Sequence, residues 1–268
     1  MKRNLLNAVV LGALAMPTFA MAADAVAEHT VTSNVALVSN YLYRGISQTG
    51  AVPAIQGGFD YAHASGLYAG VWSSSISWLT DSPAVTGATS AQVELDTYFG
   101  YKGAVSDVAY DVGFLRYNYP ATYVATLPTP VPGAPSAKAD TNEIYGAATY
   151  SIVTAKVSYA LGDLFGVSKA KGSTYFELNA AYPVADTGVT VSGHYGVQTY
   201  KGASADALKA AASDPTYSDY KLSVAKDFSG YALGLAYGGT NANKVQYTSG
   251  TNKYLGKSTA VLSLSRSF

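Results

Sequence analysis

The sequence contains no cysteine, only three histidines, and few charged residues, which make up 13 % of the chain. The 17 acidic and 17 basic side chains balance one another, so no excess of positive charge indicates a nucleic-acid partner. The absence of cysteine is compatible with an oxidising compartment. Scattered histidines without cysteine carry no spacing typical of a transition-metal site. The composition therefore predicts no metal, no cofactor and no nucleic acid.

Long hydrophobic runs are also missing, because no segment approaches the ~18 apolar residues that a membrane-spanning helix needs. The N-terminus carries a shorter run, Leu5 to Ala15, after the basic pair Lys2-Arg3. Ala20-Met21-Ala22 then offers a small-x-small cleavage site. This pattern predicts a secretory signal peptide over residues 1–22 and a mature domain over residues 23–268.

The residues that are abundant are Tyr and Gly, with 23 and 26 copies. A chain rich in both, with little charge, suits a sheet that has one face in lipid and aromatic belts at the two membrane interfaces. A soluble periplasmic or secreted protein is the alternative that a signal peptide leaves open.

Apolar and polar residues alternate with a period of two in most of the mature chain, which is typical of β-strands. The clearest case is residues 91–101, where Val93, Leu95 and Phe99 oppose Glu94 and Asp96. A soluble sheet would show the same alternation, with the apolar side in a core. Twelve such strands are predicted, over residues 30–44, 53–62, 67–77, 91–101, 108–119, 141–150, 155–162, 175–182, 189–198, 217–226, 231–237 and 257–268.

Two of these strands carry further expectations. In the first, Tyr41 and Tyr43 continue the apolar face begun by Val31, so we expect a strand that runs unbroken to Arg44. In the fifth, the apolar parity switches between Phe114 and Leu115. The switch predicts a β-bulge, or the point where the strand leaves the membrane.

The connections between the predicted strands alternate strictly between long and short. A soluble sandwich has no reason to shorten every second connection, whereas a barrel in an outer membrane has short periplasmic turns and long extracellular loops. The longest loop, 120–140, contains five prolines, and loop 201–215 is expected to hold a brief helix over residues 205–212. The sequence therefore predicts an all-β fold, a transmembrane antiparallel β-barrel of about twelve strands in the outer membrane of a Gram-negative bacterium.

The last strand ends on a C-terminal Phe268, with Leu262 and Leu264 on the same face. A terminal aromatic on a closing strand resembles the signal read by the barrel-insertion machinery, although Arg266 departs from the usual pattern. We therefore expect Leu262, Leu264 and Phe268 to form a C-terminal assembly signal. The expected partners are the barrel-assembly machinery, outer-membrane lipid and lipopolysaccharide, and small solutes.

Four stretches also carry a resemblance to a known family: SNYLYRGISQT (39–49), PAIQGGFDY (53–61), GLYAGVW (66–72) and YNYP (117–120). Together they resemble the TorF-type porin family, the Gcw_chp domain family of proteobacterial outer-membrane proteins, over nearly all of the mature chain. The resemblance implies an outer-membrane barrel. It brings no catalytic or binding residues, and the porin function of that family is itself only proposed.

The face opposite the lipid holds the charged residues, which would cost about 2–4 kcal/mol each in hydrocarbon near the midplane in the case of Arg or Lys. They are therefore predicted to line the lumen. The predicted lumen-lining residues are Arg44, Asp60, Glu94, Asp96, Asp111, Glu143, Lys156, Glu177, His194 and Lys221. These charges either line a solute path or pair with one another and fill the bore, and twelve strands lie between the filled and the water-filled cases.

Catalysis is the weaker interpretation of the polar residues. His63-Ala64-Ser65 has a His-x-Ser spacing but lies in a predicted turn, where such residues commonly bond their own backbone. His194, near Glu177, is interpreted as a hydrogen-bonded lumen histidine. We expect no enzyme but a porin-like channel for passive diffusion of small hydrophilic solutes or ions. The alternative is a non-conducting structural or adhesive barrel that acts through its extracellular loops.

Overall fold

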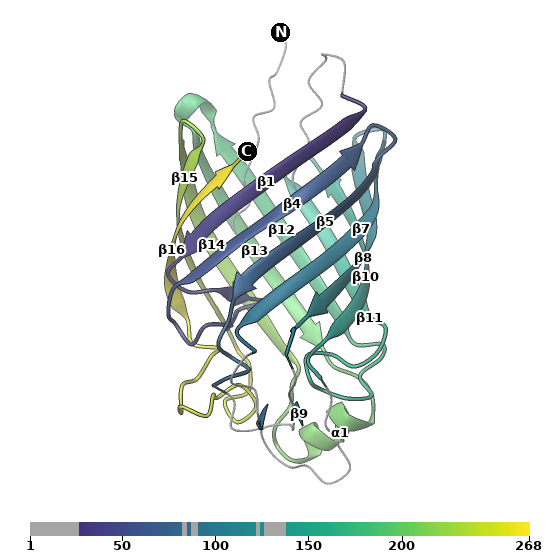
Figure 1. Cartoon of the computed structure of the whole chain (residues 1–268), viewed down its shortest axis with the longest axis vertical. Helices are drawn as coiled ribbons and strands as arrows, with labels where there is room; N and C mark the ends of the chain where they lie inside the picture. The colour runs from purple at the N-terminus through teal and green to yellow at the C-terminus, as the bar shows by residue number, and fades with distance from the viewer. Residues whose placement is uncertain (1–26, 82–84, 87–90, 122–123, 126–137) are drawn as a thin grey trace.

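The computed structural model describes residues 27–81, 85–86, 91–121, 124–125 and 138–268. The chain forms one closed antiparallel barrel of twelve strands, in which each strand pairs with its neighbours along the chain (Figure 1). Among the described residues, no helix is long and apolar enough to cross a bilayer. The barrel strands are β1 (His29–Val38), β4 (Ala54–His63), β5 (Leu67–Ser75), β7 (Val93–Val105), β8 (Val108–Asn118), β10 (Thr141–Tyr150), β11 (Val153–Ala160), β12 (Thr174–Val184), β13 (Val189–Thr199), β14 (Tyr217–Phe228), β15 (Tyr231–Thr240) and β16 (Thr259–Ser267).

Shorter elements lie between the barrel strands. The pair β2 (Leu42–Tyr43) and β3 (Ile46–Ser47) forms a small hairpin, and β6 (Val85–Thr86) pairs with β9 (Val124–Ala125). A 3-10 turn, η1 (Ala185–Thr187), connects β12 to β13. The helix α1 (Ala203–Ala210) confirms the helix expected in loop 201–215, two residues earlier than predicted.

The barrel closes where its first and last strands meet. β1 pairs with β4 on one side and with β16 on the other. The final residue takes part, because the Phe268 amide donates to the Ser33 carbonyl at 2.8 Å and the Ser33 amide donates to the Phe268 carbonyl oxygen at 3.1 Å. Closure leaves no unpaired sheet edge, which is what a sheet in lipid requires.

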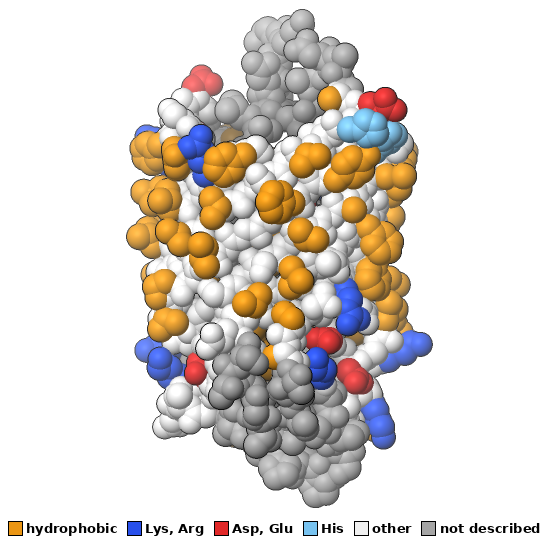
Figure 2. Space-filling model, viewed as in Figure 1, with side chains coloured by type: hydrophobic (Ala, Val, Ile, Leu, Met, Phe, Trp, Pro, Cys, Tyr) orange, Lys and Arg blue, Asp and Glu red, His pale blue; other side chains and the backbone are white. Residues whose placement is uncertain are grey.

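The apolar side chains of each alternating strand lie on the outer wall of the barrel. On β7, Phe99 is 59 % exposed while Glu94, on the opposite face, is 1 % exposed. Figure 2 shows these apolar side chains spread over the wall, with most charged side chains towards its two ends. Tyrosines form an exposed girdle near one end, at positions 61, 101, 150, 182 and 231, as expected at a membrane interface. The predicted transmembrane β-barrel is confirmed.

The two ends of the barrel differ as predicted. At the turn end, short connections such as 64–66 and 229–230 join neighbouring strands. At the loop end, the connections are longer, such as 39–53 and 241–258. β1 begins and β16 ends at the turn end (Figure 1). Most of the predicted loop 120–140, and the whole predicted signal peptide, lie outside the described residues.

The predicted first strand is too long. β1 ends at Val38, and Tyr41 and Tyr43 are 5 % and 9 % exposed instead of facing lipid. They belong to residues 39–53, which turn into the barrel and are called the inner segment below. Arg44 therefore reaches the interior from this segment and not from a wall strand. The error arose because aromatic residues that pack inside the bore continue the same alternation as aromatic residues that face lipid.

The predicted bulge in the fifth strand is also wrong. β8 pairs residue by residue with β7 and with β10 across the parity switch. Leu115 and Tyr117 are each 1 % exposed and point inward, where they belong to a buried cluster with Tyr41 and Tyr43. Apolar residues occupy the inner face there because the inner segment covers it. Arg116 faces outward at the loop end, which agrees with the alternative interpretation that the strand leaves the membrane there.

Candidate functional site in the barrel lumen

The inner segment is held in shape by its own polar side chains. Asn40 accepts hydrogen bonds from Ser47 Oγ at 2.6 Å and from Thr49 Oγ1 at 3.3 Å. Thr49 Oγ1 in turn accepts from the Tyr41 amide at 3.2 Å, and the Gln48 amide donates to the Tyr41 carbonyl at 2.8 Å. These contacts join the two arms of the segment. They let it keep a compact form within the barrel.

The hairpin β2–β3 forms the tip of the inner segment. Arg44 and Gly45 are its two turn residues, with φ of 44° and 75°, as a type I′ turn requires. A Cβ at Gly45 would lie 2.6 Å from Asp219 Cβ on β14. Glycine is therefore needed both for the backbone conformation and for the close approach of the tip to the wall.

Arg44 attaches this tip to wall strands β10 and β13. Its guanidinium donates from Nη1 to Glu143 Oε1 at 3.0 Å, from Nη2 to Glu143 Oε2 at 2.7 Å, and from Nη1 to Gln198 Oε1 at 2.6 Å. The guanidinium carbon also lies 4.2 Å from the ring centroid of Tyr175. This two-pronged contact with a carboxylate suits arginine and not lysine. Burial alone would lower the pKa of Arg44, but the adjacent Glu143 carboxylate outweighs it, and the pKa is raised.

A second cluster at the same depth is acidic. Glu94 accepts hydrogen bonds from Tyr41 at 2.9 Å and from Tyr119 at 3.1 Å. Asp96, next to it on the inner face of β7, is 1 % exposed, and its Oδ1 has no hydrogen-bond partner among the described residues. Tyr43 Oη donates to Tyr117 Oη at 2.6 Å and links this cluster to the Arg44 side. Together these side chains occupy the bore close to its loop end.

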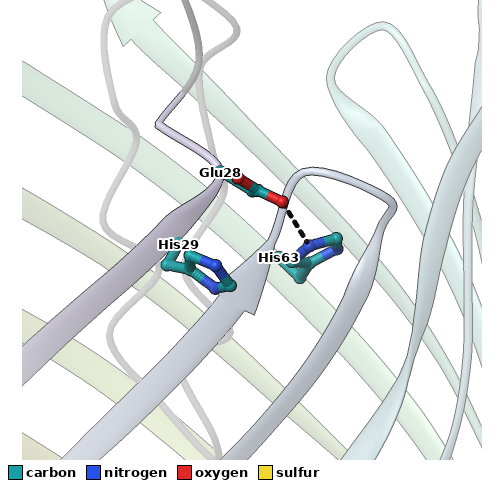
Figure 3. Close-up of side chains that lie close together, drawn as sticks. All are labelled: Glu28, His29 and His63. Carbon is teal, nitrogen blue, oxygen red and sulfur yellow. Dashed lines mark ion pairs between the residues drawn. The ribbon is translucent and has the colours of Figure 1, made fainter.

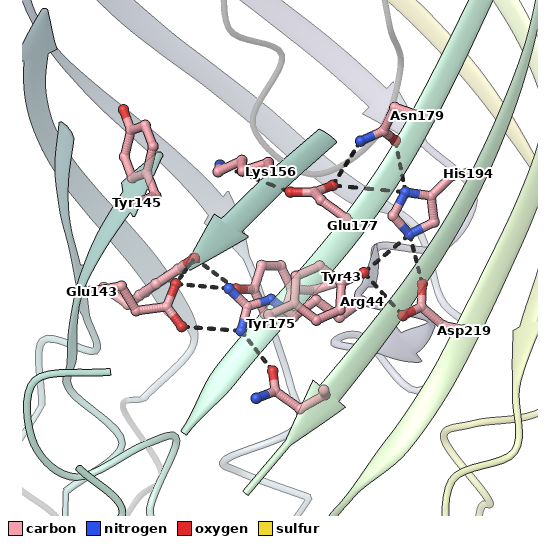
Figure 4. A network of polar contacts seen from close by, with 12 residues as sticks. Tyr43, Arg44, Glu143, Tyr145, Lys156, Tyr175, Glu177, Asn179, His194 and Asp219 are labelled. Carbon is pink, nitrogen blue, oxygen red and sulfur yellow. Dashed lines mark hydrogen bonds and ion pairs between the residues drawn. The ribbon is translucent and has the colours of Figure 1, made fainter. Parts of the chain in front are cut away.

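A mixed-charge network lies deeper in the barrel, beyond the inner segment (Figure 4). The His194 Nδ1 is 2.7 Å from Asn179 Oδ1, and its Nε2 is 2.9 Å from Asp219 Oδ1. Lys156 Nζ lies 3.9 Å from Glu177 Oε1. These side chains line a cavity whose empty volume, counted with its opening to solvent, is about 560 Å³. The cavity is bounded by Arg44, Lys156, Tyr175, Glu177, His194, Asp219 and Lys221.

Polar pairs continue towards the turn end. Tyr98 donates to Asp60 at 2.5 Å, and Tyr68 donates to Asp111 at 2.6 Å. Lys102 Nζ lies 4.6 Å from the ring centroid of Tyr68. Polar side chains therefore continue from the cavity to the turn end, where tyrosine hydroxyl groups donate hydrogen bonds to the carboxylates.

The structure places the predicted lumen-lining residues in three groups. Arg44 and Glu143 meet at the tip of the inner segment, with the pair Glu94 and Asp96 nearby. Arg44 also lines the cavity, together with four further predicted residues, namely Lys156, Glu177, His194 and Lys221. Asp60 and Asp111 lie near the turn end and do not contact the others.

Sequence reasoning missed the tyrosines that complete these groups, and it missed Asp219. Asp219 lies on the polar face of a predicted strand but was not singled out, although it contacts both His194 and Tyr175. One signal in the sequence could have predicted that the segment with Tyr41 and Tyr43 leaves the wall. Arg44-Gly45 between short alternating arms is a hairpin pattern, because a two-residue turn with positive φ favours glycine.

The His-x-Ser motif forms a turn at the turn end. His63 Nδ1 accepts a hydrogen bond from the Ser65 amide at 3.1 Å and is 2.7 Å from Ser65 Oγ. These are local contacts within the β4–β5 connection. His63 is on the same face of β4 as Tyr61, which is exposed on the outer wall, so the His63–Ser65 pair does not join the lumen groups.

The predicted terminal signal lies on the outer wall. Leu262, Leu264 and Phe268 are 54 %, 45 % and 64 % exposed. Arg266 stacks its guanidinium 4.5 Å from the ring centroid of Tyr231 and 4.9 Å from that of Phe268. The arginine that departs from the usual pattern therefore packs along aromatic rings at the turn end, where its charge reaches the interface.

Comparison with protein families gives one match. The family model described as a bacterial protein of unknown function (Gcw_chp) matches residues 22–268. A search of the curated proteins gave no match.

Solved structures that match this chain include two porins and an outer membrane channel. A NanC porin is 8 % identical, with a TM-score of 0.49, over 89 % of this chain and 99 % of that chain. The KdgM porin in complex with disordered oligogalacturonate is 6 % identical, with a TM-score of 0.47, over 89 % and 98 %. The outer membrane channel DcaP of Acinetobacter baumannii is 9 % identical, with a TM-score of 0.40, over 90 % and 97 %. All three scores lie below 0.5, so no property of those proteins is transferred to this chain.

Proposed function

Because the chain belongs to the Gcw_chp family, whose function is unknown, we propose from its own side chains that it is a passive channel of the Gram-negative outer membrane. Small hydrophilic solutes or ions diffuse through its lumen. The inner segment narrows the bore, and the fixed charges of both signs bias which ions pass.

The observation that carries this proposal is the polar cavity behind the inner segment. In a barrel that served only as a scaffold, the interior side chains would pair with one another and fill the bore. Here the bore holds a cavity lined by charged side chains of both signs, with an empty volume of about 560 Å³ that includes its opening to solvent. A polar cavity inside a membrane barrel supports a path for hydrophilic solutes.

The inner segment sets the size limit in this proposal. It is attached to the wall at several strands, through Arg44 to β10 and β13 and through Tyr41 to β7. The free passage is what remains beside it. Such a passage admits ions and small solutes more easily than polymers or folded proteins, so the channel is proposed to be narrow.

Single-channel recordings test this directly. Purified mature protein in a planar bilayer is expected to show small, discrete conductance steps. The variant Arg44→Ala loses all three hydrogen bonds that attach the tip to Glu143 and Gln198. We expect its conductance to rise several-fold, or its open state to flicker, because the tip leaves the bore.

A matched control is Arg116→Ala. Arg116 faces outward at the loop end and pairs with Asp140 at 3.7 Å, so its removal should leave the conductance unchanged. Silence of both the wild type and Arg44→Ala would favour the second candidate function, a non-conducting barrel that acts through its extracellular loops. Equal conductance of the wild type and Arg44→Ala would remove the inner segment from the solute path.

We also propose that Leu262, Leu264 and Phe268 act as the assembly signal for the barrel-insertion machinery, after export with removal of residues 1–22. Deleting Phe268 removes an exposed aromatic ring and the two backbone hydrogen bonds to Ser33. We expect less folded protein in the outer membrane, measured as the fraction that shifts on gels after heating. Phe228→Ala is the control, since Phe228 is 52 % exposed at the same end but outside the terminal strand.

A deletion variant that assembles as well as the wild type at normal expression would refute this role of Phe268. A loss of equal size in Phe228→Ala would show that any exposed aromatic ring at the turn end matters, and not the terminal one.

A further inference from the structure

Two of the three histidines meet on the outside of the barrel at the turn end (Figure 3). His29 begins β1 and His63 ends β4, and the antiparallel register places them directly opposite one another. Their ring centroids are 5.2 Å apart. Both face the outer side, as do their strand neighbours Val31 and Tyr61, which are 71 % and 39 % exposed.

Glu28 completes the group. Its Oε1 lies 3.7 Å from His63 Nε2. Its carbonyl accepts a hydrogen bond from the Ala64 amide at 2.9 Å, which fixes the backbone of Glu28 against the β4–β5 turn. One donor atom from each of Glu28, His29 and His63 lies within 4.8 Å of the others. Donors around a tetrahedral Zn²⁺ are about 3.3–3.5 Å apart, so small side-chain rotations bring these three to a shared ion.

The contact of the other ring nitrogen of His29 favours the same arrangement. His29 Nδ1 is 2.8 Å from Tyr61 Oη, so when Nδ1 carries the proton the Tyr61 oxygen accepts it and His29 Nε2 keeps its lone pair. His63 Nδ1 accepts from the Ser65 amide at 3.1 Å and is 2.7 Å from Ser65 Oγ, so an ion at His63 Nε2 would exchange the amide contact for donation from Nδ1 to Ser65 Oγ. Metal-binding histidines commonly donate their other N–H to such an oxygen, which sets the tautomer and the ring orientation.

We propose that Glu28, His29 and His63 bind a divalent transition-metal ion of the zinc class at the turn end of the barrel. Two imidazoles and one carboxylate form a donor set that suits Zn²⁺, and Ni²⁺ and Cu²⁺ as well. Three protein ligands leave a coordination position open to water or to a neighbouring phosphate. The ion joins the start of β1 to the end of β4, at the part of β1 that extends beyond its pairing with β16.

The test uses the untagged mature chain, folded in detergent, and titration with Zn²⁺ followed by calorimetry. One ion is expected to bind per chain, and Co²⁺ in its place is expected to give the intense visible absorption of a tetrahedral site. His29→Gln and His63→Gln should each weaken Zn²⁺ binding at least tenfold, and Glu28→Gln should weaken it less. His194→Gln is the matched control, because it removes the lumen histidine and leaves Glu28, His29 and His63 intact.

Each outcome is decisive. Unchanged binding in His194→Gln together with lost binding in His29→Gln and in His63→Gln supports the site. The absence of saturable Zn²⁺ binding to the folded wild type overturns it, as does binding that survives in the double variant His29→Gln/His63→Gln. Binding that is lost only in His194→Gln would place the ion in the lumen and also overturn the proposal. Heat-modifiable gel migration of every variant verifies that the barrel is folded.

Discussion

Arginine in place of Leu235 is expected to abolish folding of the barrel into lipid bilayers. Leu235 lies at the middle of β15, with its side chain 51 % exposed on the outer wall between Val224 and Leu262. An arginine on the lipid face near the midplane of the bilayer costs about 2–4 kcal/mol. The measurement is the fraction of protein that folds into lipid vesicles, followed by its shift on gels after heating.

Leu95→Arg is the matched control for depth. Leu95 faces the same way but lies near the start of β7 at the loop end, opposite Asn118 of β8. An arginine near the interface costs about 0–1 kcal/mol, so this variant should fold almost as well as the wild type. Equal folding of Leu235→Arg and the wild type would show that the wall at β15 does not face hydrocarbon. Equal loss in both variants would show that depth in the bilayer does not decide the cost.

The outer wall could be predicted from sequence because its signal is local. Each strand that faces lipid must place an apolar residue at every second position, and a period of two is visible within about ten residues. Val93 and Phe99 on β7 illustrate this, since both are exposed on the wall as expected. The short turns have an equally local signal. The strands could therefore be counted from the sequence, and their even number could be predicted.

The interior could not be predicted in the same way, because it depends on which distant residues meet. Tyr43 packs on Tyr117, 74 positions later, and Arg44 bonds to Gln198, 154 positions later. A pattern with a period of two says that a side chain faces inward. It does not say whether water or another segment of the chain lies there, so Leu115 was misread as part of a bulge.

The two histidines at the turn end, His29 and His63, also could not be brought together from the sequence. His29 and His63 look scattered in the sequence, and no spacing rule for metal ligands covers a separation of this length. They meet because β1 and β4 pair with His29 opposite His63. This register depends on the length of the inner segment, which connects the two strands. Absence of a motif therefore did not exclude a donor set that a sheet assembles across strands.

Glutamine in place of Glu143 is expected to lower the free energy of unfolding by about 3–5 kcal/mol, the usual cost of removing one partner of a buried ion pair. Glutamine has nearly the same volume, so the change tests charge and not packing. The side chains of Arg44 and Glu143 are only 5 % and 2 % exposed. The loss of the carboxylate leaves the guanidinium buried without its counter-charge. Chemical unfolding from lipid vesicles measures the difference.

The decisive comparison repeats Glu143→Gln in the Arg44→Ala background. There, Glu143 is itself the buried charge without its ion-pair partner, and the Tyr117 hydroxyl donates to it at 3.3 Å. Removing the charge should then be neutral or stabilising, so the effect of the same substitution changes sign with the partner. Asp140→Asn serves as the control, because its pairs with Arg116 and Lys138 lie at the surface and contribute about 0–1 kcal/mol. An equal cost of Glu143→Gln in both backgrounds would mean that the inner segment is attached by packing alone. The ion pair would then not be what keeps the tip inside the bore.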